Sequence, residues 1–224
     1  MSASEVKSFI QYIAPIIRAE ADRRGYDICS TVIAQSIIEG RYGTSTLAKV
    51  YFNHFGLKSG TTWRGKSVNL KTKEEYTPGT LVTIKDYFRV FDNDIDGISG
   101  YYDFISTKRY ANLKYAKDYR QYAEYLKQDG YATSSTYVQT LCDTVKKYNL
   151  YTWDDKEPST EKYYPKCSEN HTSIAQALDE IGVDSSKSNR KKIYNANFTD
   201  TYRYTAKQNM ALLVLLKQGM LIKP

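Results

Sequence analysis

The segment from Thr31 to Gly43 constrains this chain more than any other part of it. Apolar residues at 32, 33, 34, 37 and 38 have the spacing of a helix with one buried face. Glu39 closes that apolar stripe, and Gly40 supplies a helix stop. The negative end of the helix dipole and the loss of water beside apolar neighbours both favour a protonated carboxyl group. Glu39 is therefore a candidate general acid, and the competing interpretation is a surface glutamate that merely ends a helix.

Length and charge limit the possible classes of protein. A chain of 224 residues can hold one large domain, or a medium-sized domain with a small module. The formal net charge is +7, and residues 161–224 contribute +4 of it, with ten basic and six acidic side chains. A basic surface suits nucleic acid, anionic lipid or an anionic wall polymer. Because nucleic-acid signatures and apolar runs of ~18 residues are absent, we expect neither nucleic-acid binding nor membrane insertion.

The histidines and cysteines argue against metal or cofactor chemistry. His54 and His171 do not form the H-E-x-x-H or H-x-x-E-H pattern of a zinc site, and glycine-rich phosphate loops are absent. The sequence therefore predicts no metal and no cofactor. Cys29 and Cys142 lie in helical patterns, so both are predicted to be small buried thiols rather than parts of a disulfide framework.

Periodicity predicts a mainly helical chain with one hairpin. The ranges expected to be helical in the first two thirds are 4–25, 30–39, 44–48, 95–105, 116–128 and 134–147. Two β-rich segments, 68–77 and 81–91, flank Thr77-Pro78-Gly79-Thr80 and predict a β-hairpin.

A polar stretch with one proline, residues 152–162, is typical of a linker. Beyond it, three short helices are expected at 173–182, 188–197 and 206–218. The last of them carries a core of leucines at 212, 213, 215 and 216. A unit of this size folds alone only marginally.

The motifs around Glu39 occur in a recognisable order. Glu39 is followed by a Gly-Arg-Tyr-Gly turn, by Leu47-Ala48 and by Asn53-x-Phe55-Gly56-x-Lys58. This arrangement resembles the core of the autolysin and flagellar-type N-acetylglucosaminidases, glycoside hydrolase family 73. Further matching segments are Thr72-Lys73-Glu74-Glu75-Tyr76, Phe88-Arg89-Val90-Phe91, Tyr122-Ala123 and Gly130-Tyr131-Ala132-Thr133.

The resemblance covers about residues 5–150 and implies an α+β lysozyme-like fold that is mainly α. We therefore expect a helical catalytic domain with a small β-hairpin lobe over 1–155, a linker over 156–161 and a three-helix module over 162–224.

Hydrolysis of a glycosidic bond requires an acid, together with an activated water or a nucleophile on the other face of the sugar. The resemblance supports Glu39 as the acid and places the second carboxylate in the hairpin. Side chains alternate along a strand, so only one of Glu74 and Glu75 can face the cleft. Alignment on Thr72 selects Glu74, which we favour, whereas counting back from the turn selects Glu75. The substrate's own acetamido group is a third candidate.

The resemblance also implies substrate-binding residues. Asn53 and Phe55 match a motif that lines the sugar cleft, and Tyr131 and Thr133 belong to the Gly-Tyr-Ala-Thr segment near the acid. A core tyrosine with a bonded hydroxyl is the alternative interpretation of Tyr131.

The C-terminal residues resemble the small helical cell-wall-binding modules of some phage endolysins of Gram-positive hosts. Matching segments include Arg-Lys-Lys-Ile at 190–193 and Leu-Leu-Lys-Gln-Gly at 215–219. We therefore expect the catalytic domain to bind peptidoglycan glycan strands and the module to bind an anionic or glycan wall polymer. The alternative for the module is a stabilising helical appendage.

The predicted function is that of an endolysin that hydrolyses the β-1,4 bond between N-acetylglucosamine and N-acetylmuramic acid. Because the N-terminus lacks a secretory pattern, we expect the protein to stay in the host bacterial cytoplasm until its release to the wall. Two rivals are a muramidase or lytic transglycosylase of lysozyme-like fold, and a non-catalytic sugar-binding protein of the cell wall.

Overall fold

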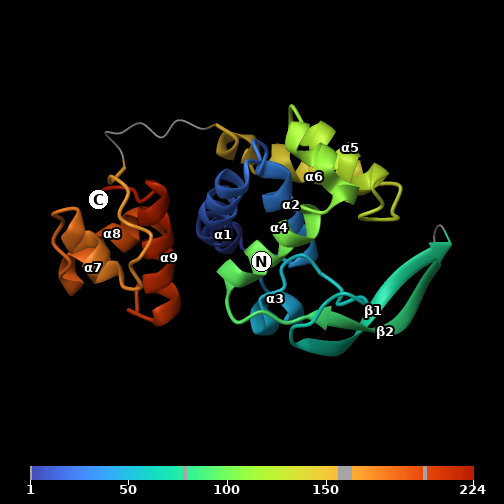
Figure 1. The fold of residues 1–224 in the computed structure, drawn as a ribbon, viewed down its shortest axis with the longest axis horizontal. Coiled ribbons are helices and arrows are strands. Elements are labelled where there is room, and N and C mark those ends of the chain that lie inside the picture. The colour runs from blue at the N-terminus through green and yellow to red at the C-terminus, as the bar shows by residue number, and fades with distance from the viewer. Residues whose placement is uncertain (1, 78–79, 156–162, 199–200) are drawn as a thin grey trace. The chain divides into compact units, whose positions relative to one another are not determined.

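The computed structural model describes residues 2–77, 80–155, 163–198 and 201–224 (Figure 1). Contacts between Cα atoms divide the chain into two compact units, Glu20–Asp154 and Met1–Ala19 together with Asp155–Pro224. The domain boundaries at 155 and 162 stay a prediction, and the linker over 156–161 lies outside the described residues. Within the described ranges, no helix is both long and apolar enough to cross a membrane.

The predicted mainly helical fold is confirmed. The helices before residue 155 are α1 (Ala3–Arg24), α2 (Ser30–Glu39), α3 (Thr46–Tyr51), α4 (Asp94–Ile105), α5 (Tyr119–Gln128) and α6 (Tyr137–Lys147). Two 3-10 helices, η1 (Lys108–Tyr115) and η2 (Leu150–Trp153), were not predicted, because a threefold repeat leaves no 3.6-residue pattern. The expected helix at 44–48 begins later, because the Ser45 hydroxyl caps α3 by accepting from the Ala48 amide.

The predicted hairpin is present. Strands β1 (Ser67–Thr77) and β2 (Thr80–Arg89) pair antiparallel, with an irregularity between Glu75 and Thr77. Figure 1 shows the two strands extending away from the helices of their unit. Their base is anchored, because Phe88 is buried and the Arg89 amide donates to the Leu57 carbonyl at 2.9 Å. The hairpin is thereby fixed to the loop that follows α3.

Helix α2 forms the centre of the unit Glu20–Asp154. Every residue from Ser30 to Ile37 is buried, and the helix packs against α5, α6 and η2. Cys29 and Cys142 are fully buried, as predicted. The burial therefore includes the polar residues Thr31, Gln35 and Ser36, whose side chains are hydrogen-bonded within the unit.

The beginning of α2 is capped by a side chain from the far end of the unit. The Asp154 carboxylate accepts hydrogen bonds from the amides of Cys29 and Ser30, each at 2.8 Å, and from the Ser30 hydroxyl at 2.6 Å. The polar composition of 152–162 is typical of a linker, but residues 152–154 of that stretch belong to the unit Glu20–Asp154. Their polar character serves the 3-10 helix η2 and this cap.

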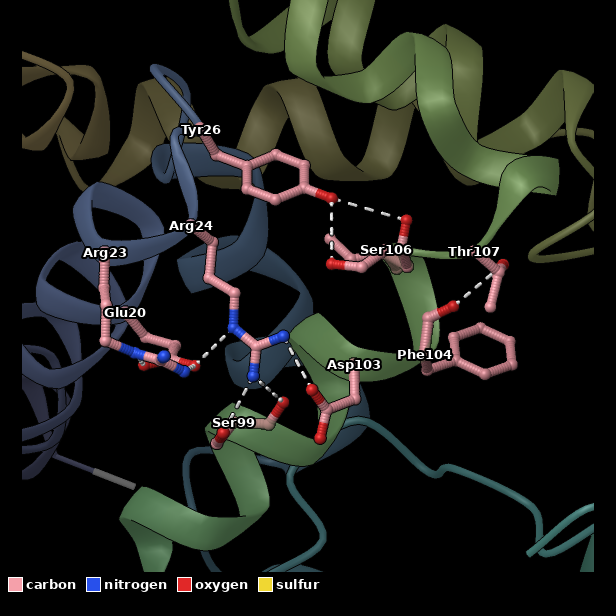
Figure 2. Close-up of polar contacts among 10 residues, drawn as sticks. Glu20, Arg23, Arg24, Tyr26, Ser99, Asp103, Phe104, Ser106 and Thr107 are labelled. Carbon is pink, nitrogen blue, oxygen red and sulfur yellow. Dashed lines mark hydrogen bonds and ion pairs between the residues drawn. The ribbon is translucent and has the colours of Figure 1, made fainter.

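A second polar network ties the end of α1 to α4 (Figure 2). Arg24 contacts Glu20 at 2.8 Å, Asp103 at 2.6 Å and the Ser99 hydroxyl at 3.1 Å. Burial by itself would raise the pKa of Glu20, but hydrogen bonds from Arg23 and Arg24 outweigh it and hold that pKa below its ordinary value. All three nitrogens of the Arg24 guanidinium thus have partners within the protein.

The three C-terminal helices are also as predicted: α7 (Ile174–Glu180), α8 (Lys187–Asn197) and α9 (Ala206–Gln218). The leucines at 212, 213, 215 and 216 are buried in the core of these helices. Gly219 ends α9 with a φ of +70°, which favours glycine. Thr205 and Gln208 form a capping box at its start.

We predict that Asp154→Ala destabilises the unit that contains α2. The change removes a charged acceptor at the positive end of a helix dipole and leaves two amides without their partner. The expected loss is about 1–2 kcal/mol of unfolding free energy, which lowers the midpoint of the corresponding thermal transition by several degrees. Asp155→Ala, at the exposed neighbouring residue, is the matched control. Equal midpoints for the two variants would contradict the assigned cap.

Candidate active site

Glu39 is the last residue of α2, and its side chain is exposed. The sequence predicted a carboxylate that its apolar neighbours shield from water, and that prediction is wrong. The apolar stripe faces the core and ends at Ile37, while the helix stops at Glu39, so no further turn covers the carboxylate. A substrate can therefore approach Glu39 directly from solvent.

The turn after Glu39 has an unusual backbone. A Cβ atom at Gly40 would lie 2.5 Å from the Ser36 carbonyl oxygen and 3.2 Å from that of His54, so only glycine fits. Arg41 and Tyr42 then adopt φ values of +47° and +56°. Left-handed conformations of this kind cost ~1–3 kcal/mol each in non-glycine residues and persist where surrounding contacts enforce them.

Two contacts hold this turn in place. The Tyr42 amide donates to the Ile37 carbonyl at 3.0 Å, and the Tyr42 hydroxyl lies 3.0 Å from the hydroxyl of Tyr148. The hydrogen bond to Tyr148, with a smaller effect of burial, raises the pKa of Tyr42 to about 12. Tyr42 is therefore a neutral, fixed side chain beside the candidate acid.

Gln35 orients the face of α2 that also carries Glu39. Its amide oxygen accepts from the Tyr101 hydroxyl at 2.5 Å, and its amide nitrogen donates to the Tyr137 hydroxyl at 2.8 Å. Glu39 lies four residues further, one turn along the same face. The two tyrosines thus mark the side of the helix toward which the candidate acid is directed.

Tyr131 lies at the centre of an aromatic cluster on that side. Its ring stacks on Tyr137 at 6.2 Å and meets the rings of Tyr101 and Phe104 edge-on, at 6.2 and 6.0 Å. Its hydroxyl donates to the Phe55 carbonyl at 3.3 Å.

Burial raises the pKa of Tyr131 and of Tyr137 well above the ordinary value, and the negative charge of Glu39 acts in the same direction on both. Glu39 and Tyr131 therefore belong to one electrostatic environment. The structure brings together these two residues, which the sequence singled out separately.

Asn53 and Phe55 hold the loop between α3 and the hairpin. The Asn53 amide nitrogen donates to the carbonyls of Leu57 and Arg89, each at 2.9 Å, and its oxygen accepts from the Leu57 amide at 2.8 Å. The Phe55 ring stacks on Tyr101 at 4.1 Å. Both side chains are buried, so these contacts are those of positioning residues. Their predicted contact with sugar stays a prediction.

The remaining predicted site residues lie on the loop after α5 and on strand β1. Thr133 is exposed, and Lys127 fixes its segment by donating from Nζ to the carbonyls of Ala132, Thr133 and Ser134. Glu74 and Glu75 pair with Val82 and Leu81 in the hairpin. The side chains of both glutamates lie outside the described part, so the choice between them stays open.

His54 has a structural partner that the sequence did not indicate. Its Nε2 atom lies 2.6 Å from the Asp94 carboxylate at the start of α4, and both side chains are buried. This pair joins the loop behind Gly40 to α4. Within the described ranges, no three His, Cys, Asp or Glu side chains are grouped so as to hold a metal ion.

Comparison with known proteins agrees with this geometry. Residues 14–150, more than half of the chain, match the model of the glucosaminidase family, described as mannosyl-glycoprotein endo-beta-N-acetylglucosaminidase. The chain belongs to the glucosaminidase family. Glu39, the Gly40–Gly43 turn and the aromatic cluster around Tyr131 all fall within the matched range.

Among glucosaminidase relatives, the exo-glucosaminidase LytG of Bacillus subtilis is 30% identical over 58% of this chain and 47% of its own length. A probable N-acetylmuramidase of Lactococcus lactis is 32% identical over 68% of this chain and 36% of its own length. The chain therefore spans less than half the length of these two curated relatives.

A solved structure confirms the lysozyme-like fold. A peptidoglycan hydrolase mutant from Sphingomonas sp. A1 superimposes with a TM-score of 0.58 and 26% identity, covering 66% of this chain and 97% of the other. The predicted helical domain with a small hairpin lobe is thus the fold of a known peptidoglycan hydrolase.

Proposed function

We propose that this chain hydrolyses peptidoglycan at the β-1,4 bond between N-acetylglucosamine and N-acetylmuramic acid, with Glu39 as the general acid. The supporting observation is the position of Glu39. Its carboxylate is accessible, lies at the end of a firmly held helix and is close enough to the aromatic cluster around Tyr131 to influence it electrostatically. Relatives named as an exo-glucosaminidase and as a probable muramidase support glycan cleavage.

In the proposed reaction, Glu39 donates its proton to the oxygen of the leaving sugar. The negative end of the α2 dipole favours the protonated acid. A sugar bound over Glu39 excludes water and so supplies the desolvation that the exposed side chain lacks by itself. The neighbouring tyrosines pack their faces against other rings, which gives the acid a rigid surrounding, and their raised pKa values keep the hydroxyls neutral.

A second group completes the reaction on the opposite face of the sugar. We assign this role to Glu74, with Glu75 and the substrate's acetamido group as the alternatives. Both glutamates lie on β1, which pairs with β2. The base of this hairpin is held in place by the hydrogen bond from the Arg89 amide to the Leu57 carbonyl.

We predict that Glu39→Gln abolishes lysis of purified walls, because an amide cannot donate the required proton. The rate should fall by roughly 10²–10⁴-fold or more. Glu124→Gln, an exposed glutamate of α5, is the matched control and should keep wild-type activity. Lysis by Glu39→Gln within a few-fold of wild type would exclude Glu39 as the acid.

Product analysis tests which bond is cut. After reduction, the new ends should carry N-acetylglucosaminitol, as measured by mass spectrometry of digested walls. Muramitol would instead identify a muramidase, and 1,6-anhydromuramic acid a lytic transglycosylase. Intact walls after incubation would favour the non-catalytic sugar-binding alternative.

We further propose that residues 162–224 bind an anionic or glycan polymer of Gram-positive walls. The supporting features are the buried leucine core of α7–α9, the positive charge of this part of the chain and the exposed lysines of α8 at 187, 191 and 192. Binding of this kind raises the local concentration of the catalytic residues without new contacts at the active site.

The lysines of α8 provide the test of wall binding. In a chain inactivated by Glu39→Gln, replacing Lys191 and Lys192 by glutamine should weaken binding to whole walls several-fold and flatten its salt dependence. The control replaces two exposed lysines of the other unit, Lys108 and Lys117. An equal effect of both pairs would favour a stabilising appendage over a binding module.

A further inference from the structure

Arg89, at the end of β2, carries a positive charge that no ion pair within the described residues balances. Its guanidinium carbon lies 4.8 Å from the centre of the Trp63 ring and 5.5 Å from that of Phe104. Its Nε atom donates to the Lys58 carbonyl at 3.1 Å. The backbone is held on both sides, because the Arg89 amide donates to Leu57 and its carbonyl accepts from Asn53. The cation is therefore fixed in position.

No carboxylate of the described residues neutralises this cation. Asp103, whose charge acts on Arg89, forms its ion pair with Arg24 instead, at 2.6 Å (Figure 2). Asp86 pairs with Lys58 and Asp92 with Lys66, at 3.0 and 2.9 Å. Within the described ranges, Arg89 has no ion pair, and its two terminal nitrogens have no hydrogen-bond acceptor.

Arg89 is also half-buried, and the resulting desolvation lowers its pKa below the ordinary value. An arginine packed on two aromatic rings, with both terminal nitrogens free of a hydrogen-bond acceptor among the described residues, matches the fork geometry that binds carboxylates in a bidentate way. Partial removal from water strengthens such a pair.

The position of Arg89 connects it to the candidate acid. Phe104, one of the two rings that hold Arg89, meets Tyr131 edge-on at 6.0 Å. The negative charge of Glu39 in turn raises the pKa of Tyr131. Arg89 thus packs on a ring of the same aromatic cluster on which Glu39 acts electrostatically.

We propose that Arg89 is a specificity-determining residue that binds a carboxylate of the glycan substrate. Two sources of this carboxylate exist in peptidoglycan: the lactyl ether of muramic acid and the peptide attached to it. The inference rests on the proposed function, because it assigns a binding role at the same site.

The test compares Arg89→Gln with wild type on two substrates. One is intact peptidoglycan, and the other is glycan strands whose peptides have been removed by an amidase, which leaves free lactyl carboxylates. Each is also used after methyl esterification of its carboxylates. Arg64→Gln, an exposed arginine near Trp63 that donates to the Thr61 carbonyl, is the matched control.

We expect Arg89→Gln to lower kcat/KM about ten- to a hundredfold, mainly through KM, on at least one substrate with free carboxylates. Dependence on Arg89 with intact strands identifies the peptide carboxylate, and dependence only with stripped strands identifies the lactyl group. On the methyl ester, wild type should fall to the level of the variant, with no further loss in Arg89→Gln.

Equal losses for Arg89→Gln on free acids and on esters would overturn the proposal, as would wild-type rates that esterification leaves unchanged. The second comparison alters only the substrate, so it decides the question even if the variant folds poorly. Failure of the proposed function has a different signature, because wild type would then cleave neither unmodified substrate.

Discussion

The Asp154 carboxylate holds the two ends of the unit Glu20–Asp154 at one point. It accepts the hydrogen bonds of the Cys29 and Ser30 amides, more than a hundred residues earlier in the chain. The acceptor is charged and lies at the positive end of the α2 dipole, so both hydrogen bonding and electrostatics favour it. Because α2 is buried from Ser30 to Ile37, fixing its first turn also fixes the residues at its other end. The position of Glu39 depends on this cap.

At the other end of α2, the absence of a side chain at Gly40 allows the His54 carbonyl to approach. From there the contacts continue in two directions. His54 pairs with Asp94 at the start of α4, and Asn53 binds the Arg89 carbonyl at the base of the hairpin. A single glycine thus brings Glu39, the α4 helix and the strand that carries Arg89 to one place.

The sequence predicted α2 to the residue, and the hairpin and the C-terminal helices closely, because each has a regular period and a distinct terminus. It failed where structure depends on distant partners. Asp154 lies in a polar stretch, which is equally typical of a linker, and nothing local indicates its bond to Ser30. Arg89 belongs to a motif and Gln35 to the predicted helix 30–39, but the contacts of both follow only from the tyrosines and rings that surround them.

The tyrosines show most clearly why composition could not predict the site. Tyrosine is abundant in the sequence, but its count does not say where the rings lie; Tyr101 is fully buried and bonded to Gln35. In the cluster, the hydroxyls of Tyr101, Tyr131 and Tyr137 each have a hydrogen-bond partner while the rings pack together, so these three phenols are accommodated in a mainly helical core. The same cluster also bears on which side chains can exchange a proton at the site. The raised pKa values of Tyr131 and Tyr137 keep both hydroxyls protonated at neutral pH, so Glu39 is the group beside this cluster whose charge can change in the proposed reaction.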